Sequence, residues 1–187
     1  SNHFPYTAIF GSNAAAPSEC PGVAPYPRPW HAAFVRIELI NTGSELLYGR
    51  VLNTHQQWLG QQLAAAGYEL THQQTVPDTG AAIQAAVREA IARSELVIVT
   101  GGLGPTSDDI TRQRIAELLD TPLEEHAETR DRITAIFRKL KRPMPEAVLG
   151  QAQVPAVAIV LPNRHGTAPG LAMRTPNGWL IMLPGPP

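Results

Sequence analysis

The sequence predicts an α/β protein with a mainly parallel β-sheet, helices on both faces and a C-terminal β-hairpin. Three observations lead to this class. Short apolar runs alternate with segments of helical period from about residue 35 onward. The run Leu96–Thr100 has almost no polar interruption, as expected for a strand buried on both faces. Near the end of the chain, the pair Asn177-Gly178 separates two apolar runs and therefore predicts a hairpin turn.

The first half of this region divides into alternating strands and helices. We expect one strand over Val35–Asn41 and a second over Tyr68–Val76. Asn53 is a good N-cap for the helix between them, and Gly67 is expected to end that helix. The next helix has the clearest amphipathic pattern in the chain, with apolar residues at Ile83, Ala86, Val87, Ala90 and Ile91. The buried strand Leu96–Thr100 follows it.

The second half of the chain is expected to contain three further helices and three further strands. In order, these are a helix after Asp109, a longer helix with Ile133, Ile136, Phe137 and Leu140 that ends near Pro143, a short helix over Glu146–Gln153, and strands over Val157–Leu161, Ala172–Thr175 and Trp179–Leu183.

Composition restricts the classes of function. The formal net charge of −1 over 187 residues argues against a nucleic-acid binder, which would carry a basic excess. No apolar run approaches the ~20 residues that a membrane-spanning helix needs, so no membrane partner is expected. The single cysteine, Cys20, excludes an intrachain disulfide and fits a cytoplasmic location. Residues 1–33 are proline-rich and aperiodic, which predicts an irregular arm before one domain over 34–187.

The segment from Gly101 to Thr111 is the most informative in the chain. Its glycines let the backbone turn sharply and expose N–H groups to a ligand. Asp108, Asp109 and Thr111 follow, at the expected start of a helix. A strand, a glycine loop and a helix N-terminus together favour an anionic ligand. Because carboxylates repel a bare phosphate, their presence indicates a bridging metal ion or proton chemistry. The alternative is that one aspartate merely caps the helix and the glycines merely form a turn.

Two better-known phosphate loops are excluded by the spacing. A dinucleotide fingerprint requires a third glycine where Ser107 or Asp108 stands. A Walker loop requires a lysine, and none lies near this loop.

Two more polar loops are expected at the same edge of the sheet. Thr42–Glu45 follows the first predicted strand, and Pro77-Asp78 follows the second. In parallel sheets, ligands bind beyond the carboxyl ends of the strands, where the topology changes direction. The sequence therefore predicts one site formed by these two loops and Gly101–Asp109.

Several separate motifs of this chain resemble those of a known family and occur in the same order. The chain from about Val35 to Pro187 resembles the N-terminal domain of the competence/damage-inducible CinA family, within the wider molybdopterin-binding fold of molybdenum-cofactor biosynthesis proteins. The matching segments are Asn41–Gly49, Asn53-Thr54, Val76–Asp78, Thr100–Arg112, Arg142–Glu146, Gly166–Gly170 and Leu183–Gly185.

This resemblance implies a three-layer α/β/α domain with a pocket for a pterin-like or nucleotide-like phosphate ester. It implies functional roles for Asp78 and Asp109, pocket positions for Ser44 and Glu45, and phosphate contacts from Gly102 and Gly104. Gly166, Thr167 and Gly185 are expected to close the other side. Further ligand contacts are expected from Thr42, Gly43, Asn53, Gly101, Thr106 and Asp108. Relatives also suggest a homo-oligomer.

Three activities remain open at this point. The resemblance links the domain with metal-dependent hydrolysis of ADP-ribose, while the wider superfamily includes enzymes that adenylylate molybdopterin. A non-catalytic nucleotide-binding or molybdopterin-binding module is the third alternative. For hydrolysis, Asp78 and Asp109 would hold Mg²⁺, Mn²⁺ or Co²⁺, since hard oxygen ligands suit such ions. Glu45 is a candidate base, or alternatively a capping carboxylate on the turn at Leu46-Leu47.

The chain departs from the family pattern in two respects. Family members often carry a second domain, a nicotinamide-mononucleotide amidase, and no such activity is expected from these residues. Arg50 stands where the family pattern suggests glutamine.

Overall fold

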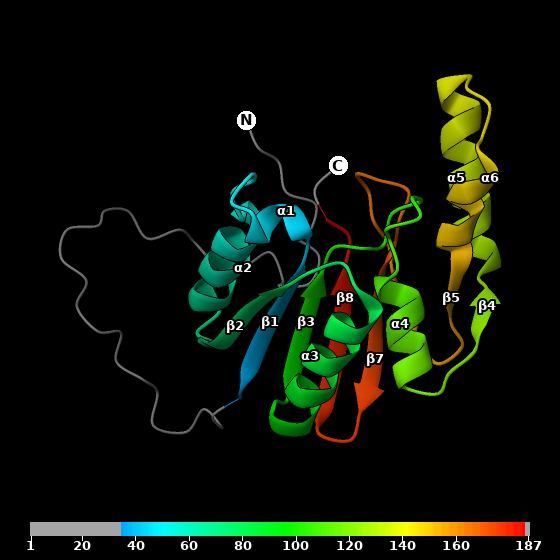
Figure 1. Ribbon diagram of the computed structural model, residues 1–187. Helices are drawn as coiled ribbons and strands as arrows, with labels where there is room; N and C mark the ends of the chain where they lie inside the picture. The colour runs from blue at the N-terminus through cyan, green and yellow to red at the C-terminus, as the bar shows by residue number, and fades with distance from the viewer. Residues whose placement is uncertain (1–34, 186–187) are drawn as a thin grey trace.

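A six-stranded sheet forms the centre of the computed structural model, which describes residues 35–185 (Figure 1). The strand order is β2-β1-β3-β8-β7-β6. The strands are β1 (Ile37–Thr42), β2 (Leu70–Val76), β3 (Leu96–Thr100), β6 (Ile159–Leu161), β7 (Gly170–Thr175) and β8 (Gly178–Leu183). Strands β2, β1, β3 and β8 run parallel, whereas β7 is antiparallel to both of its neighbours. The predicted mainly parallel sheet and the C-terminal hairpin β7–β8 are confirmed.

Helices cover both faces of this sheet, because its central strands are apolar on both sides. The helices are α1 (Ser44–Leu47), α2 (Thr54–Ala65), α3 (Gly80–Arg93), α4 (Thr111–Leu118), α5 (Ala127–Leu140) and α6 (Glu146–Leu149). One core contains Leu59 and Leu63 of α2 with Ile98 of β3. The other contains Ile83 of α3 and Ile115 of α4, packed with further strand residues. The three-layer α/β/α class follows from these two cores.

Local signals explain where individual helices begin. The Oδ1 atom of Asn53 accepts a hydrogen bond from the Gln56 N–H at 3.0 Å and caps α2 as predicted.

The turn of the β7–β8 hairpin contacts the end of α3. The amide of Asn177 donates to the carbonyls of Ile91 and Ala92 at 2.9 Å each. The end of α3 is thereby attached to the hairpin.

One ion pair connects β1 with the end of α3. Glu38 is only 1% exposed, although it lies in a strand of the central sheet. Its carboxylate accepts hydrogen bonds from the Arg93 guanidinium at 2.6 and 2.9 Å and from the Ser94 hydroxyl at 2.7 Å. The bond from Arg93 lowers the pKa of Glu38, against the opposing effect of burial.

A small second sheet is absent from the sequence prediction. Strands β4 (Leu123–Glu125) and β5 (Gln153–Pro155) pair antiparallel beside α5 and α6. Each has three residues, too few to show a period of two, and β4 carries two glutamates. The core here contains Ile133 of α5, Val148 of α6 and Ala152 of the 3₁₀ turn Gly150–Ala152.

Several helices and strands begin or end at residues other than the predicted ones. Helix α5 ends at Leu140, because Lys141 adopts a left-handed conformation with φ of 52°, two residues before Pro143. The predicted short helix divides into α6 and the 3₁₀ turn. Strand β6 begins at Ile159, later than predicted.

The two edges of the six-stranded sheet differ. Edge strand β2 has the sequence LTHQQTV, in which polar residues occupy both faces. The opposite edge strand, β6, is only three residues long. Within residues 35–185 no helix is long and apolar enough to cross a membrane. The predicted arm, with Cys20, lies outside the described residues.

Candidate functional site

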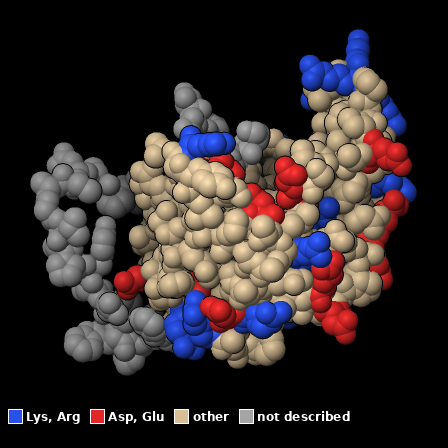
Figure 2. Space-filling model, in the orientation of Figure 1, with Lys and Arg blue, Asp and Glu red and all other residues tan. Residues whose placement is uncertain are grey.

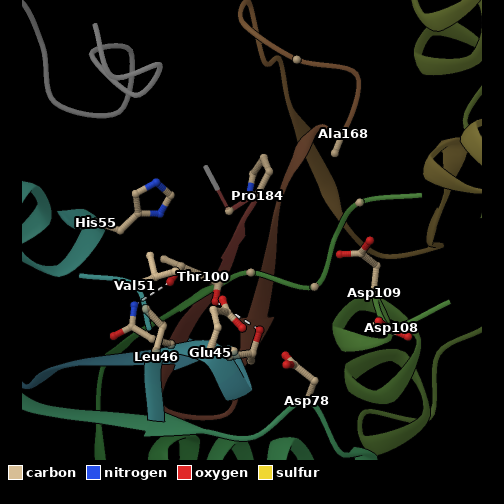
Figure 3. A pocket seen from close by; sticks show the side chains of 18 of the residues that line it. Glu45, Leu46, Val51, His55, Asp78, Thr100, Asp108, Asp109, Ala168 and Pro184 are labelled. Carbon is tan, nitrogen blue, oxygen red and sulfur yellow. Dashed lines mark hydrogen bonds between the residues drawn. The ribbon is translucent and has the colours of Figure 1, made fainter. Parts of the chain in front are cut away.

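A pocket of about 950 Å³ lies at the carboxyl ends of the parallel strands (Figure 3). Residues from all three predicted loops line it, together with the loop between β6 and β7 and the end of β8. The predicted site residues that line this pocket are Thr42, Gly43, Glu45, Asn53, Asp78, Gly101, Gly102, Gly104, Asp108, Asp109, Gly166, Thr167 and Gly185. Ser44 and Thr106 are not among the lining residues; each instead contacts one of the pocket's aspartates.

The glycine loop crosses the pocket in a conformation that side chains would prevent. Gly101 and Gly102 have φ angles of 100° and 66°. A Cβ atom on Gly101 would lie 2.6 Å from the Thr42 hydroxyl oxygen, and one on Gly102 would overlap the hydroxyl of Thr111. Within residues 35–185, the N–H groups of Gly102, Leu103 and Gly104 form no hydrogen bond. Unpaired N–H groups in a glycine loop of this kind suit an anionic ligand.

Asp109 is held by its own loop and does not cap the following helix. Its Oδ2 atom accepts hydrogen bonds from the Thr106 N–H at 2.9 Å and from the Thr106 hydroxyl at 2.5 Å. Ile110 occupies the N-cap of α4, and no side chain caps that helix. The capping interpretation of Asp108 or Asp109 is therefore wrong, because the backbone turns through Thr106–Asp109 before the helix begins.

Arg112 supplies positive charge close to Asp109. Burial lowers the pKa of the Arg112 guanidinium, and the charge of Asp109 opposes that shift. Arg112 also donates to the Gly150 carbonyl at 2.9 Å, which connects α4 with the 3₁₀ turn. It does not line the pocket, but its charge interacts with Asp109, which does.

Asp78 and Glu45 enter the pocket from the side of α1. The Ser44 N–H donates to Oδ2 of Asp78 at 2.8 Å, and the Asp78 N–H faces the Ser44 hydroxyl at 3.5 Å. Glu45 is exposed, and its carboxylate lies against Gly43. Since α1 has no side-chain capping hydrogen bond, the capping interpretation of Glu45 finds no support. Figure 3 shows Glu45 and Asp78 on this side and Asp109 across the glycine loop.

Buried polar side chains fix the floor of the pocket. The Asn41 amide donates to the Thr100 hydroxyl at 2.6 Å and accepts from the Gln73 amide at 3.3 Å. The Thr42 hydroxyl donates to the Thr100 carbonyl at 3.3 Å and lies 3.4 Å from the hydroxyl of Thr111. Because buried polar groups are costly without partners, this network holds the strand ends in one arrangement.

The wall of the pocket across from the glycine loop is the 163–168 loop, which connects β6 and β7. Asn163 is 7% exposed. Its Oδ1 accepts from the His165 N–H and its Nδ2 donates to the Ala168 carbonyl, both at 2.9 Å. Arg132 of α5 donates to the carbonyls of Asn163, Gly166 and Thr167. Sequence reasoning missed both residues. An asparagine ahead of a glycine is a turn signal that could have indicated Asn163, whereas nothing in the sequence indicates Arg132.

His55 and nearby apolar residues form a further part of the wall that sequence reasoning missed. His55 lies in the first turn of α2, is 8% exposed, and has a pKa lowered by burial. Leu46, Val51 and Leu52 also line the pocket. Their position directly after the predicted loop residues was the available signal. The pocket therefore has a polar, acidic part and a more apolar part.

The described lining carries negative charge. It contains four carboxylates, Glu45, Asp78, Asp108 and Asp109, and within residues 35–185 no lysine or arginine lines it. Figure 2 shows acidic side chains gathered at the hollow on this face. Among the described residues, no group of three or more His, Cys, Asp or Glu side chains is arranged to hold a metal ion.

Comparison with known proteins identifies relatives over most of the chain. Residues 38–187 match the family of probable molybdopterin binding domains. A CinA-like protein of Desulfovibrio desulfuricans is 44% identical over 154 residues, covering 82% of this chain and 36% of that protein. A putative competence-damage inducible protein of Caldicellulosiruptor saccharolyticus is 44% identical over 150 residues, covering 80% and 36%. The chain thus spans little more than a third of the length of these curated relatives.

Solved structures agree with this comparison. CinA of Thermoplasma acidophilum, described as having unknown function, superposes with a TM-score of 0.71 at 31% identity, covering 80% of this chain and 87% of that one. The molybdopterin biosynthesis enzyme MoaB of Thermus thermophilus superposes with a TM-score of 0.53 at 22% identity, covering 82% of each chain. The second likeness establishes the shared fold alone.

Proposed function

Because this chain belongs to the family of probable molybdopterin binding domains, and within it to the CinA family, we propose that its pocket binds a nucleotide or pterin phosphate and hydrolyses a nucleotide pyrophosphate such as ADP-ribose. One observation carries the proposal. Two aspartates, each held by hydrogen bonds through one oxygen, line the same pocket as a glycine loop with unpaired N–H groups.

The glycine loop would bind the phosphate oxygens. The left-handed conformations of Gly101 and Gly102 fix the turn that precedes the unpaired N–H groups of Leu103 and Gly104, so little ordering is needed when an anion arrives. The more apolar wall near Val51 and Leu52 offers contact area for a planar ring.

The acidic residues fit a divalent ion that binds together with the ligand. Mg²⁺ is commonly held by one or two carboxylates together with substrate phosphates, not by a complete protein cage. Asp78 and Asp109 each have one oxygen engaged with the protein, through Ser44 and Thr106. Their remaining oxygens would hold Mg²⁺, Mn²⁺ or Co²⁺, which would neutralise the charge of the phosphates.

Glu45 is the residue proposed to accept the proton of the attacking water. Its carboxylate is exposed to the pocket, next to the Asp78 side of the site. Hydrolysis then requires a water molecule between Glu45 and the phosphorus atom that is attacked.

The test is AMP release from ADP-ribose with Mg²⁺, Mn²⁺ or Co²⁺, compared between the wild type and Asp109→Asn. Changes to groups that merely support metal ligands cost 10–100-fold, so loss of a ligand should lower turnover by about 100-fold or more. Asp120→Asn is the matched control, since Asp120 has a φ of 50°, which asparagine also tolerates, and lies outside the pocket.

Each outcome distinguishes the alternatives. Turnover that depends on metal and is lost in Asp109→Asn supports the proposal. Absence of turnover, with thermal stabilisation by ADP-ribose, would favour a binding module or adenylyl transfer. Wild-type rates in Asp109→Asn would overturn the assigned site.

A further inference from the structure

The 163–168 loop is held by Arg132 of α5, a residue that does not itself line the pocket. The Nη2 atom of Arg132 donates to the carbonyl oxygens of Gly166 and Thr167, both at 3.1 Å, and Nη1 donates to the Asn163 carbonyl. Gly166, Thr167 and Ala168 line the pocket, whereas Arg132 does not. The loop therefore contacts the guanidinium through its carbonyl oxygens and borders the cavity through Gly166, Thr167 and Ala168.

This arrangement determines where the N–H groups of the loop point. In a trans peptide, the C=O and N–H of one plane point in opposite directions. The Gly166 carbonyl shares a plane with the Thr167 N–H, and the Thr167 carbonyl shares one with the Ala168 N–H. Because both carbonyls point to the same Nη2 atom, the two N–H groups point away from Arg132, and the residues that carry them line the cavity.

Neither N–H group has a partner in the part of the chain that the structure describes. The hydrogen bonds recorded for Thr167 and Ala168 involve their carbonyl oxygens only. Ala168 is 6% exposed, and unpaired buried N–H groups are rare in folded proteins. Figure 3 shows Ala168 above the pocket, across from the glycine loop.

We infer that the N–H groups of Thr167 and Ala168 form a second anion subsite, which Arg132 positions and which faces the glycine loop across the pocket. Successive unpaired N–H groups in one loop bind anions elsewhere in proteins. The positive charge of Arg132 behind the loop strengthens this preference, since arginine stays protonated even where burial lowers its pKa. The occupant is the second phosphate of a diphosphate ester, so the inference rests on the proposed function and specifies its ligand class.

The first test follows the backbone amides of the ¹⁵N-labelled protein by NMR. The probe is α,β-methylene ADP, a diphosphate nucleotide that resists hydrolysis, with Mg²⁺ present. We expect the amide signals of Thr167 and Ala168 to shift in parallel with those of Gly102 and Gly104. Shifts at the two glycines alone would overturn the second subsite but leave the proposed function standing. No shift at either loop, and no binding, would overturn both.

The second test isolates Arg132. We expect wild-type protein to bind α,β-methylene ADP more tightly than AMP, and Arg132→Gln to reduce affinity for the diphosphate about tenfold, the effect of about one charge-assisted hydrogen bond. Affinity for AMP should change less than twofold. An equal loss for both nucleotides, or no loss in a variant with an unchanged circular dichroism spectrum, would overturn the positioning role. If Arg132→Gln does not fold, the NMR experiment on the wild type still decides whether the subsite exists.

Arg130→Gln is the matched control. Arg130 lies on the same helix, two residues earlier, and pairs with Glu125 and Asp131 at the surface. We expect the control to bind both nucleotides like the wild type. A similar loss of diphosphate preference in Arg130→Gln would assign the effect to helix α5 in general and overturn the role of Arg132.

Discussion

The carboxylate of Asp109 is fixed by Thr106, three residues earlier in the same loop. Oδ2 of Asp109 lies 2.5 Å from the Thr106 hydroxyl oxygen and 2.9 Å from its backbone nitrogen. Gly104 is also required here, because a Cβ atom at that position would lie 2.5 Å from the same oxygen. One face of the carboxylate is thus engaged with the protein, and Oδ1 forms no hydrogen bond with the described residues.

We expect Thr106→Val to lower the rate of pyrophosphate hydrolysis about tenfold, because Asp109 then loses its hydroxyl partner but keeps the backbone N–H. Thr106→Ser should retain most of the activity, since serine preserves the hydroxyl. The measurement is kcat/KM for ADP-ribose at saturating metal. Equal activity in the valine and serine variants would mean that the hydroxyl does not position Asp109.

Gly102→Ala should distort the glycine loop. The substitution places a side chain at a φ of 66° and overlaps the hydroxyl of Thr111, so we expect a loss of about 1–3 kcal/mol in the free energy of unfolding and weaker AMP binding. Gly60→Ala is the control, because a Cβ atom there meets nothing within 4 Å in the middle of α2. That change should stabilise the protein by about 0.5–1 kcal/mol. Urea denaturation of both variants measures these changes in the free energy of unfolding. Equal changes in Gly102→Ala and Gly60→Ala would contradict the strain assigned to Gly102.

The Glu38–Arg93 pair should make stability depend on acid pH. The pKa of Glu38 is lowered in the folded state, so its contribution is present above the unfolded pKa of about 4.3 and is lost as pH falls through the folded value. In Arg93→Ala the main cause of the lowered pKa is removed and burial raises the folded pKa of Glu38, so the acid-induced loss of stability that Glu38 contributes should become smaller.

At neutral pH, Arg93→Ala should also cost about 1–3 kcal/mol, toward the lower end because the Arg93 side chain is 46% exposed. Arg36→Ala, which breaks the exposed pair with Glu95, should cost much less. Denaturation curves between pH 3 and pH 7 test these expectations. An equal fall in the free energy of unfolding with acid in the wild type and in Arg93→Ala would refute the pH dependence assigned to the Glu38–Arg93 pair.

His55 should produce a second pH dependence nearer neutrality. Burial lowers its pKa in the folded state, so the unfolded chain takes up the proton first as pH falls below about 6.5. Stability should therefore decrease below that pH, by at most about 1.4 kcal/mol per pH unit. His55→Gln should flatten this slope whatever it does to stability at pH 7.5. An unchanged slope between pH 7 and pH 5 would contradict this account.

Local sequence signals predicted the parts of the fold that depend on near neighbours. Strand β3 has the predicted bounds, Leu96–Thr100, because burial on both faces leaves a continuous apolar run. Asn53 caps α2 because its partner, the Gln56 N–H, lies only three residues away. The loops at the ends of β1, β2 and β3 could be placed at one edge, since parallel strands bring their carboxyl ends together.

The features that sequence reasoning missed depend on distant partners. The contacts of Arg132 reach 31 to 35 residues along the chain and target backbone carbonyls, which any sequence offers. Strand β4 pairs with β5 from about 30 residues away, with no apolar alternation in either. The capping alternative for Asp109 stayed open because an aspartate before a helix has the same sequence signature whether it bonds forward to the helix or back to Thr106.

The unequal edges of the main sheet affect how copies of this protein could associate. Strand β2 presents His72, Gln73, Gln74 and Thr75 at one edge, and β6 offers only three residues at the other. Very short edge strands discourage pairing with strands from another molecule. We therefore expect any homo-oligomer that forms by strand pairing to use the seven-residue β2 edge, not the three-residue β6 edge.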